Sequence, residues 1–322
     1  MKSRRKKDLH TWWKDRIEFL SIIEINGTKV SADNIYNAIT KSNAQCNFYE
    51  KGVWTSKKLA VLQYYFDIYT RIQRRRLNRL FYFDLFSGSG LIKLKNINKF
   101  IFGSALLSIL VPLKISNYLF DKYYFVEISK DRADTLKIAI EEIKKLVSKN
   151  IEYEILVDDM NDIDYEKYMK ESEHSLVVID PEGIEPKWKT VSKILDNECD
   201  VIFTFMTSGI QRLLGNRDEK VMNNVKEFIG EDTVTNEIDA QKLMKLYIEK
   251  IKSMGKEATI DILVEAKHLK YNIIVAARKT SGGNPWLKPI EEIKPKLKIS
   301  DTDLENILKV TFGIQRELPL ED

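Results

Sequence analysis

Short apolar runs alternate with helical patterns between residues 80 and 205, and this alternation constrains the fold more than any other feature. The runs fit buried strands at 80–85, 123–127, 153–157, 175–179 and 200–205. Helical patterns lie between them at about 103–114, 130–148 and 186–196, and the connection at 162–171 is expected to be helical too. Apolar strands that alternate with helices are typical of a parallel sheet covered on both faces. We therefore predict an α/β, Rossmann-like fold with a mostly parallel sheet in a domain at 51–280.

Two later strands are expected to complete a seven-stranded sheet. Residues 259–264 and 271–277 are apolar and are separated by a short polar turn. This arrangement predicts a C-terminal antiparallel hairpin at the edge of the sheet.

Flanking segments are expected on both sides of this domain. In an N-terminal extension at 1–50, the pattern predicts a helix from Trp12 to Ile25 and a second helix from Ser31 to about Thr40. The pair fits either a helix-turn-helix or, more commonly, a plain helical hairpin. A longer helix is expected at 56–74. Residues 281–322 are expected to form a wrapping loop, at 281–299, and then a short helix at 301–310.

The composition excludes several classes of protein. Of the 322 residues, 43% are hydrophobic and 10% aromatic, so the chain can bury a core. Cys46 and Cys199 form no Cys-x-x-Cys pair, which excludes a disulfide scaffold and favours a cytoplasmic location. The three histidines cannot form an H-E-x-x-H motif, so no metal is expected. No apolar segment suits a membrane span or a signal peptide.

An acidic residue or a glycine-rich loop follows each early strand. The first strand ends in Asp84-Leu85-Phe86-Ser87-Gly88-Ser89-Gly90, where Gly88 and Gly90 allow the backbone to turn tightly beside a ligand. Glu127 follows the second strand and is suited to accept hydrogen bonds from a ribose. Asp158, or its neighbour Asp159, follows the third and is suited to an adenine amino group. Ligands bind at this edge of open parallel sheets, so we expect a nucleotide site here.

Two nucleotide cofactors fit a ribose-binding acid behind a glycine loop. A nicotinamide enzyme usually has a third glycine, where this chain has Lys93, and an acid about 20 residues further on, whereas Glu127 lies much further away. Asp84 would also lie awkwardly near a pyrophosphate. S-adenosylmethionine has no phosphate, and its cationic amino group favours a carboxylate. The pattern therefore favours S-adenosylmethionine.

At these residues the sequence resembles the three-Cys-motif partner proteins, a family similar to class I S-adenosylmethionine-dependent methyltransferases. The resemblance covers roughly residues 50–280. It is carried by Trp54-Thr55 with Lys57 or Lys58, Tyr82 to Gly90, Phe102-Gly103-Ser104-Ala105-Leu106, Phe125-Val126-Glu127 and Ile179-Asp180-Pro181-Glu182-Gly183. It implies that the segment from Asp84 to Gly90, including Phe86 and Ser87, holds the methionine part of the cofactor. It further implies that Glu127 holds the ribose and Asp158 the adenine, with Asp180 at the catalytic edge.

The fourth strand end supplies the candidate catalytic residues. Asp180 is suited to orient an amine or accept its proton, and Glu182 could do the same or simply face solvent. The family has an aromatic residue where this chain has Glu182, so stacking of a target base is not expected from that position. Trp188 and Phe205 fit either a planar substrate or the core. His174 precedes the fourth strand, at the wrong end for catalysis, and is expected at the surface.

A basic run precedes the first strand, and a second one lies at the N-terminus. They comprise Arg71, Arg74, Arg75, Arg76 and Arg79, and Lys2, Arg4, Arg5, Lys6 and Lys7. Both fit either a solvated face or contact with nucleic-acid phosphates. We thus predict a methyltransferase acting on a macromolecule, with nucleic acid ahead of protein. The alternatives are a non-catalytic module that binds S-adenosylmethionine or a partner protein and, less favoured, a nicotinamide oxidoreductase.

Overall fold

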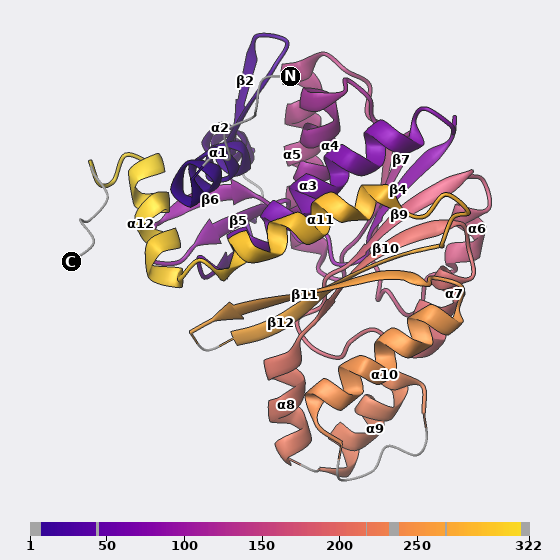
Figure 1. The fold of residues 1–322 in the computed structure, drawn as a ribbon. Helices are drawn as coiled ribbons and strands as arrows, with labels where there is room; N and C mark the ends of the chain where they lie inside the picture. Colours follow the sequence, from indigo (N-terminus) through magenta and orange to yellow (C-terminus); the bar gives the residue numbers. More distant parts are fainter. Residues whose placement is uncertain (1–7, 43–44, 217, 232–237, 268, 317–322) are drawn as a thin grey trace.

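The computed structural model describes residues 8–42, 45–216, 218–231, 238–267 and 269–316. The basic N-terminal run at 2–7 lies outside the described residues. Figure 1 shows a central twisted sheet with helices on both faces.

The central sheet has seven strands and is the expected one. Its order is β11 (Ala258–Ala266), β12 (Leu269–Ala277), β10 (Cys199–Phe205), β9 (His174–Ile179), β4 (Leu80–Asp84), β7 (Lys122–Val126) and β8 (Tyr153–Leu156). The strands from β10 to β8 are parallel, whereas β12 runs antiparallel to both β10 and β11. The expected C-terminal hairpin at the edge is therefore confirmed, and the sheet is that of a Rossmann-like class I methyltransferase fold.

Each face of the sheet packs against its own set of helices. On one face, Tyr82, Phe125 and Val178 pack in a core shared with α3 (Thr55–Gln73), α4 (Ser104–Ile115) and α5 (Lys130–Val147). On the other face, Phe83 and Val177 pack in a second core. Its helices are α6 (Tyr165–Met169), α7 (Trp188–Leu195), α8 (Thr207–Asn216), α9 (Glu219–Ile229) and α10 (Ala240–Ser253). Successive strand residues point to opposite faces, so one apolar run supplies both cores.

The N-terminal extension differs from the expected pair of helices. Helix α1 (Leu9–Ser21) ends four residues early, and β1 (Ile22–Ile25) pairs with β2 (Thr28–Ser31) across Asn26-Gly27. Asn26 has φ +49° and Gly27 has φ +81°, which is the geometry of a tight hairpin turn. The residues of β1 alternate between exposed and buried positions, with Ile23 and Ile25 buried, and this period of two favours a strand. The second helix is confirmed as α2 (Ala32–Lys41), and the Ser31 hydroxyl accepts a hydrogen bond from the Asn34 amide at 3.1 Å.

The C-terminal segment also contains more helix than expected. In place of a wrapping loop at 281–299 it forms η1 (Pro285–Leu287), α11 (Lys288–Ile293) and η2 (Lys294–Lys298). The prolines lie in the first turn of these elements, where the missing N–H has no cost. The expected last helix is α12 (Asp301–Thr311). The Trp13 indole N–H donates to the Lys296 carbonyl at 3.0 Å, so both flanking segments pack together on one core.

A small second sheet was not expected from the sequence. It consists of β3 (Tyr49–Lys51), β5 (Leu91–Leu94) and β6 (Lys99–Phe102), with β3 parallel and β6 antiparallel to β5. It brings β3 beside the glycine-rich loop that follows β4.

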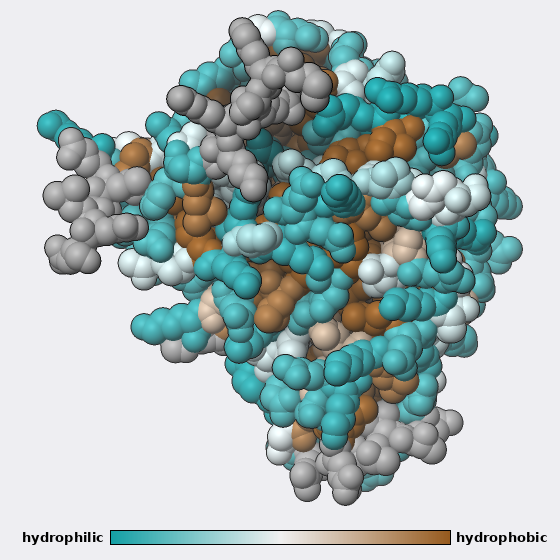
Figure 2. Space-filling view, viewed as in Figure 1, coloured by the Kyte–Doolittle hydropathy of each residue, from teal (hydrophilic) through white to brown (hydrophobic). Residues whose placement is uncertain are grey.

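The surface in the view of Figure 2 is mostly hydrophilic, and hydrophobic side chains show mainly in its middle part. Within the described parts of the chain, none of the helices combines the length and the apolar character needed to cross a lipid bilayer.

Candidate active site

A cavity of about 270 Å³ lies at the carboxyl ends of the parallel strands. Residues far apart in the chain line it: the glycine-rich loop Phe86–Gly90, the first turn of α3, the segment Asp180–Glu182, and side chains of β3, β10 and β12. This is the edge at which the sequence predicted a nucleotide site, and the small sheet supplies one wall of it.

Close packing shapes the glycine-rich loop. Gly88 has φ +61° and Gly90 has φ +80°, so both need a conformation that side chains disfavour. A Cβ atom on Gly90 would lie 2.8 Å from Cδ1 of Leu136. The Gly103 amide donates to the Gly90 carbonyl at 2.7 Å, which ties the loop to the start of α4. The loop therefore has a fixed backbone that a ligand can approach closely.

Asp84 lies beneath this loop and is fully buried. Its carboxylate accepts hydrogen bonds from the Phe86 amide and the Tyr82 hydroxyl, both at 3.3 Å. Burial raises the pKa of Asp84 to about 7; the nearby Asp180 carboxylate adds to the rise and the Ser104 hydroxyl opposes it. A cation bound beside Asp84 would favour the ionised form. The residue therefore suits the amino group of an amino-acid ligand.

Glu127 is buried at the end of β7, and four protein donors already bind its carboxylate. Oε2 accepts the Gly88 amide at 3.1 Å, and Oε1 accepts the Ser129 amide at 2.8 Å. Oε1 also contacts Nε and Nη2 of Arg132, both at 2.9 Å. The Arg132 guanidinium in turn lies over the Tyr49 ring, 4.4 Å from its centroid. A carboxylate has about four acceptor positions, so a ribose that binds both oxygens must displace Arg132.

The third strand end, like Glu127 at the second, is not part of the lining of this cavity. Asp158 is exposed at the end of β8, and its one hydrogen bond among the described residues is from the amide of Asp159. Asp159 is engaged in a local turn with the backbone and side chain of Asn161. Beside them lie two exposed aliphatic side chains that the sequence reasoning missed, Ile128 at 66% and Val157 at 50% exposure. They follow neighbouring strands and offer apolar surface beside the Glu127 carboxylate.

Asp180 and Glu182 both line the cavity, and a lysine pairs with each of them. Asp180 forms an ion pair with Lys58 of α3, and Glu182 forms one with Lys51 of β3. Oδ1 of Asp180 is buried and has no hydrogen-bond partner among the described residues. Glu182 is more exposed than Asp180, at 58% against 16%. Asp180 therefore contributes a buried acceptor atom at the catalytic edge, and Glu182 a more exposed carboxylate.

The sequence reasoning assigned no role to either lysine. The motif Trp54-Thr55 with Lys57 or Lys58, at the start of a helix, was the sequence feature that could have identified Lys58 as a site residue. The structure separates these two lysines: Lys58 faces the cavity, whereas Lys57 is buried against Asp301, 3.0 Å away. Lys51 had no comparable signal, because β3 was not expected.

The basic run lies at the amino end of β4, away from the cavity. Three of its arginines bind neighbouring groups. Arg71 forms an ion pair with Asp67 at 2.5 Å, and Arg79 forms one with Glu171 at 3.4 Å. Arg74 forms an ion pair with Asp121 at 2.8 Å and also donates to the Asn78 and Leu119 carbonyls. Arg75 and Arg76 are exposed and form no ion pair within the described part of the chain. Two of the five arginines are thus without an ion pair among the described residues, and Arg74 is largely buried in its own.

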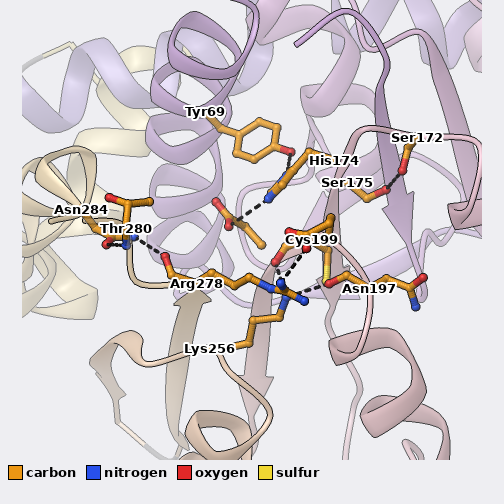
Figure 3. Close-up of polar contacts among 12 residues, drawn as sticks. Tyr69, Ser172, His174, Ser175, Asn197, Cys199, Lys256, Arg278, Thr280 and Asn284 are labelled. Atoms are coloured by element: carbon orange, nitrogen blue, oxygen red, sulfur yellow. Dashed lines mark hydrogen bonds and ion pairs between the residues drawn. The ribbon is translucent and has the colours of Figure 1, made fainter. Parts of the chain in front are cut away.

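His174 is not at the surface, which corrects the expectation. It lies in a buried polar network at the amino ends of β9 and β10 (Figure 3), where Nδ1 is 2.7 Å from the Tyr69 hydroxyl. Its Nε2 is 3.7 Å from Oδ1 of Asp200, and Oδ2 of the same carboxylate accepts a hydrogen bond from the Tyr65 hydroxyl at 2.7 Å. Burial lowers the pKa of His174 to about 4. His174 is therefore a neutral, structural residue.

Trp188 and Phe205 belong to the core rather than to the cavity. Phe205 is fully buried. Both rings pack against Tyr247, at centroid distances of 5.3 Å and 5.9 Å respectively.

No protein-family model matches the sequence, and a search of curated proteins finds no match. Several solved structures have a similar fold. Trm1 from Pyrococcus horikoshii, solved with S-adenosyl-L-methionine, is 11% identical with a TM-score of 0.38 over 80% of this chain and 62% of that chain. The N-terminal domain of human METTL16, solved with SAH, is 8% identical with a TM-score of 0.39 over 87% and 97%.

A protein from Legionella pneumophila is 12% identical with a TM-score of 0.45 over 74% of this chain and 90% of that chain. Similarity at this level of identity concerns the fold alone. The chain's own cavity residues must carry any argument about its ligand and substrate.

Proposed function

We propose that this protein is an S-adenosylmethionine-dependent methyltransferase that acts on a macromolecule, with nucleic acid favoured over protein. The supporting observation is the grouping of a glycine loop, the buried Asp84, Glu127 and Asp180 at one edge of a class I sheet. We also propose membership of the three-Cys-motif partner proteins, because four of the five motifs that carry the resemblance contribute residues to the lining of the cavity.

The residues present fit this cofactor. Asp84 would hold the amino group of the methionine part, and the loop at Gly88 and Gly90, whose positive φ angles suit glycine, would place its backbone beside it. Glu127 would bind the ribose hydroxyls after Arg132 withdraws. The exposed Ile128 and Val157 would cover the adenine ring, with Asp158 at its rim. The cofactor supplies an electrophilic methyl group on a sulfonium.

The acceptor side of the cavity suits an amine. Oδ1 of Asp180 is a buried acceptor with no partner in the described part of the chain, so it would receive a hydrogen bond from the N–H of the group to be methylated. The ion pair with Lys58 holds this carboxylate in place. Asp180 would thereby orient the nitrogen lone pair toward the methyl group and accept the proton released by transfer. Glu182 and Lys51, joined by their ion pair, line the same cavity.

A tritiated-methyl transfer assay onto DNA, RNA and protein tests the proposal. Wild type should label nucleic acid, and Asp180→Asn should lose labelling by about a hundredfold or more while it still binds S-adenosylhomocysteine. A titration with S-adenosylhomocysteine and with NAD tests the cofactor separately. Binding of NAD alone would favour the oxidoreductase and overturn the proposal.

A non-catalytic module that binds the cofactor is the second candidate. Its supporting observation is that lysines hold both carboxylates at the catalytic edge, and that Glu182 stands where the family has an aromatic residue. Tight binding of S-adenosylhomocysteine without labelling of any substrate would favour this reading.

A further inference from the structure

A second cavity, of about 460 Å³, lies at the opposite end of the molecule from the cofactor cavity. The end of α3 forms one side of it through Ile72, Arg75 and Arg76. The segment 280–286, which follows β12, forms the other side. Because β12 runs antiparallel to β10, its last residues lie at the amino ends of the parallel strands, where the basic run also lies. We call this cavity the arginine groove.

The charge of the arginine groove is positive and unopposed. Arg75 and Arg76 are exposed and form no ion pair among the described residues, and none of the residues that line the groove is acidic. Lys279, also exposed, directly precedes the lining residue Thr280. Their neighbours Arg71, Arg74 and Arg79 are bound to acids or carbonyls, so the two arginines of this run without an ion pair among the described residues are those that line the groove.

The loop opposite the arginines is held in a defined shape. The Gly283 amide donates to the Thr280 carbonyl at 2.9 Å, and the Thr280 amide donates to the Asn284 side chain at 3.1 Å. Asn284 reaches back to the Arg278 carbonyl at 2.8 Å, and Figure 3 shows these residues together. Gly283 has φ +72°, which a side chain would disfavour.

The tip of the same loop offers two further donors. Within the described part of the chain, the amide N–H groups of Ser281 and Gly282 have no hydrogen-bond acceptor. Free backbone amides beside guanidinium groups form an anion site. Trp286 lines the same groove and is half-buried, so a planar aromatic side chain lies next to the cations.

We propose that the arginine groove binds the phosphate backbone of a single-stranded nucleic acid, with a base against Trp286. Arginine pairs with phosphate through two hydrogen bonds, and aromatic side chains stack on unpaired bases. The choice of a nucleic acid rests on the proposed function, since the groove would hold a distant part of the substrate of the cofactor cavity. The two sites are separated by at least the length of the central strands, about 20 Å for six residues. The bound strand must therefore extend over several nucleotides.

Fluorescence anisotropy with fluorescein-labelled (dT)20 and (rU)20 tests the groove. Arg75→Ala/Arg76→Ala should bind either strand about tenfold more weakly than wild type at low salt. The slope of log affinity against log salt should fall by about 1.4, for two lost phosphate contacts on a single strand. The matched control is Arg71→Ala/Arg79→Ala, which removes the same charge from arginines already paired with acids and should stay within about twofold of wild type. Equal loss in both variants would overturn the proposal, because it would indicate an effect of net charge alone.

Trp286 is tested by a conservative pair of variants. Trp286→Leu should weaken binding about fivefold or more through lost stacking, whereas Trp286→Phe should keep most of it. Equal binding by Trp286→Leu and wild type would remove the base contact from the proposal. Binding of a phosphopeptide in place of either strand would overturn the nucleic-acid assignment.

The outcome is separable from that of the proposed function. Arg75→Ala/Arg76→Ala should bind S-adenosylhomocysteine as wild type does, because the groove lies at the other end of the sheet. If wild type binds neither strand at low salt, the groove proposal fails although cofactor binding stands. If wild type binds the strands through the groove but does not bind S-adenosylhomocysteine, the methyltransferase proposal fails and the groove assignment stands.

Discussion

At the scale of single residues, Asp84 has the environment that most distinguishes this cavity from an ordinary strand end. A fully buried carboxyl with a pKa near 7 is partly protonated at neutral pH, so its charge responds to whatever binds beside it. A cationic amino group would lower that pKa and drive the proton off.

We therefore expect S-adenosylhomocysteine to bind with proton release. At pH 6, where free Asp84 is mostly protonated, up to about one proton should leave per ligand bound. Calorimetric titration in buffers of different ionisation enthalpy measures this number. Asp84→Asn should abolish the release and weaken binding. Unchanged release in that variant would assign the proton to another group.

Glu127 and Arg132 should affect the cofactor in opposite directions. Glu127→Gln removes the charge that binds the ribose and should weaken S-adenosylhomocysteine about tenfold or more. Arg132→Met keeps an apolar stem beneath Tyr49 but frees Oε1 of Glu127, so binding should tighten by about threefold to tenfold. Both affinities come from the same calorimetric titration. If both variants weaken binding equally, the ion pair itself is part of the binding site and Arg132 does not withdraw.

At the scale of elements, the flanking segments are part of the fold rather than appendages. Helix α1 inserts the fully buried Trp13 beneath η2, and β3 supplies Tyr49 and Lys51 to the cavity. Contacts of this kind tie the first 50 residues both to the core and to the site.

Trp13→Ala should lower the free energy of unfolding by about 3–5 kcal/mol, the usual cost of removing a buried Trp side chain. Trp13→Phe, which loses the hydrogen bond to Lys296 but keeps a ring, should cost less. Urea unfolding followed by circular dichroism measures both. A change below about 1 kcal/mol for Trp13→Ala would mean that α1 is dispensable to the fold.

At the scale of the whole molecule, buried ionisable groups of the sheet have opposite effects on how stability depends on pH. Burial raises the pKa of Asp84 to about 7 and that of Asp200 to about 6, so both bind protons more strongly folded than unfolded. Their stabilisation is full at low pH and is lost as the pH rises through those values. Burial lowers the pKa of His174 to about 4, so its contribution is present above 6.5 and is lost as the pH falls toward 4.

His174→Gln should isolate one of these contributions. On going from pH 7 to pH 4.5, the variant should gain about 2–3 kcal/mol of stability relative to wild type, because it has no imidazole to protonate on unfolding. Comparing the two pH values cancels the constant cost of the lost Tyr69 hydrogen bond. Urea unfolding at both values measures the difference. Parallel pH profiles for the two proteins would contradict the structural role of a neutral His174.

Local pattern in the sequence was enough to predict the central sheet and the acids at its edge. Strands such as β4 and β10 are continuous apolar runs, and the turn at Gly88 and Gly90 depends on glycine itself, so both can be recognised from neighbouring residues. Asp84, Glu127 and Asp180 follow strands directly, and parallel strands place their carboxyl ends at one edge whatever the rest of the chain does. The prediction that the helix continues beyond Ser21 was wrong. A segment of four residues is compatible with both the helical and the strand period, and here its pairing with β2 in a hairpin makes it a strand.

Contacts between distant segments were decided only by tertiary structure. The ion pair of Lys58 with Asp180 joins residues 122 positions apart, and that of Lys51 with Glu182 joins residues 131 positions apart. Tertiary structure also decides that Arg75 and Arg76 form no ion pair among the described residues although neighbouring arginines do. It likewise places the loop at 280–286 opposite them. Periodicity and turn chemistry report only what lies nearby in the chain. Which cation meets which acid, and which remains free, depends on how the elements pack.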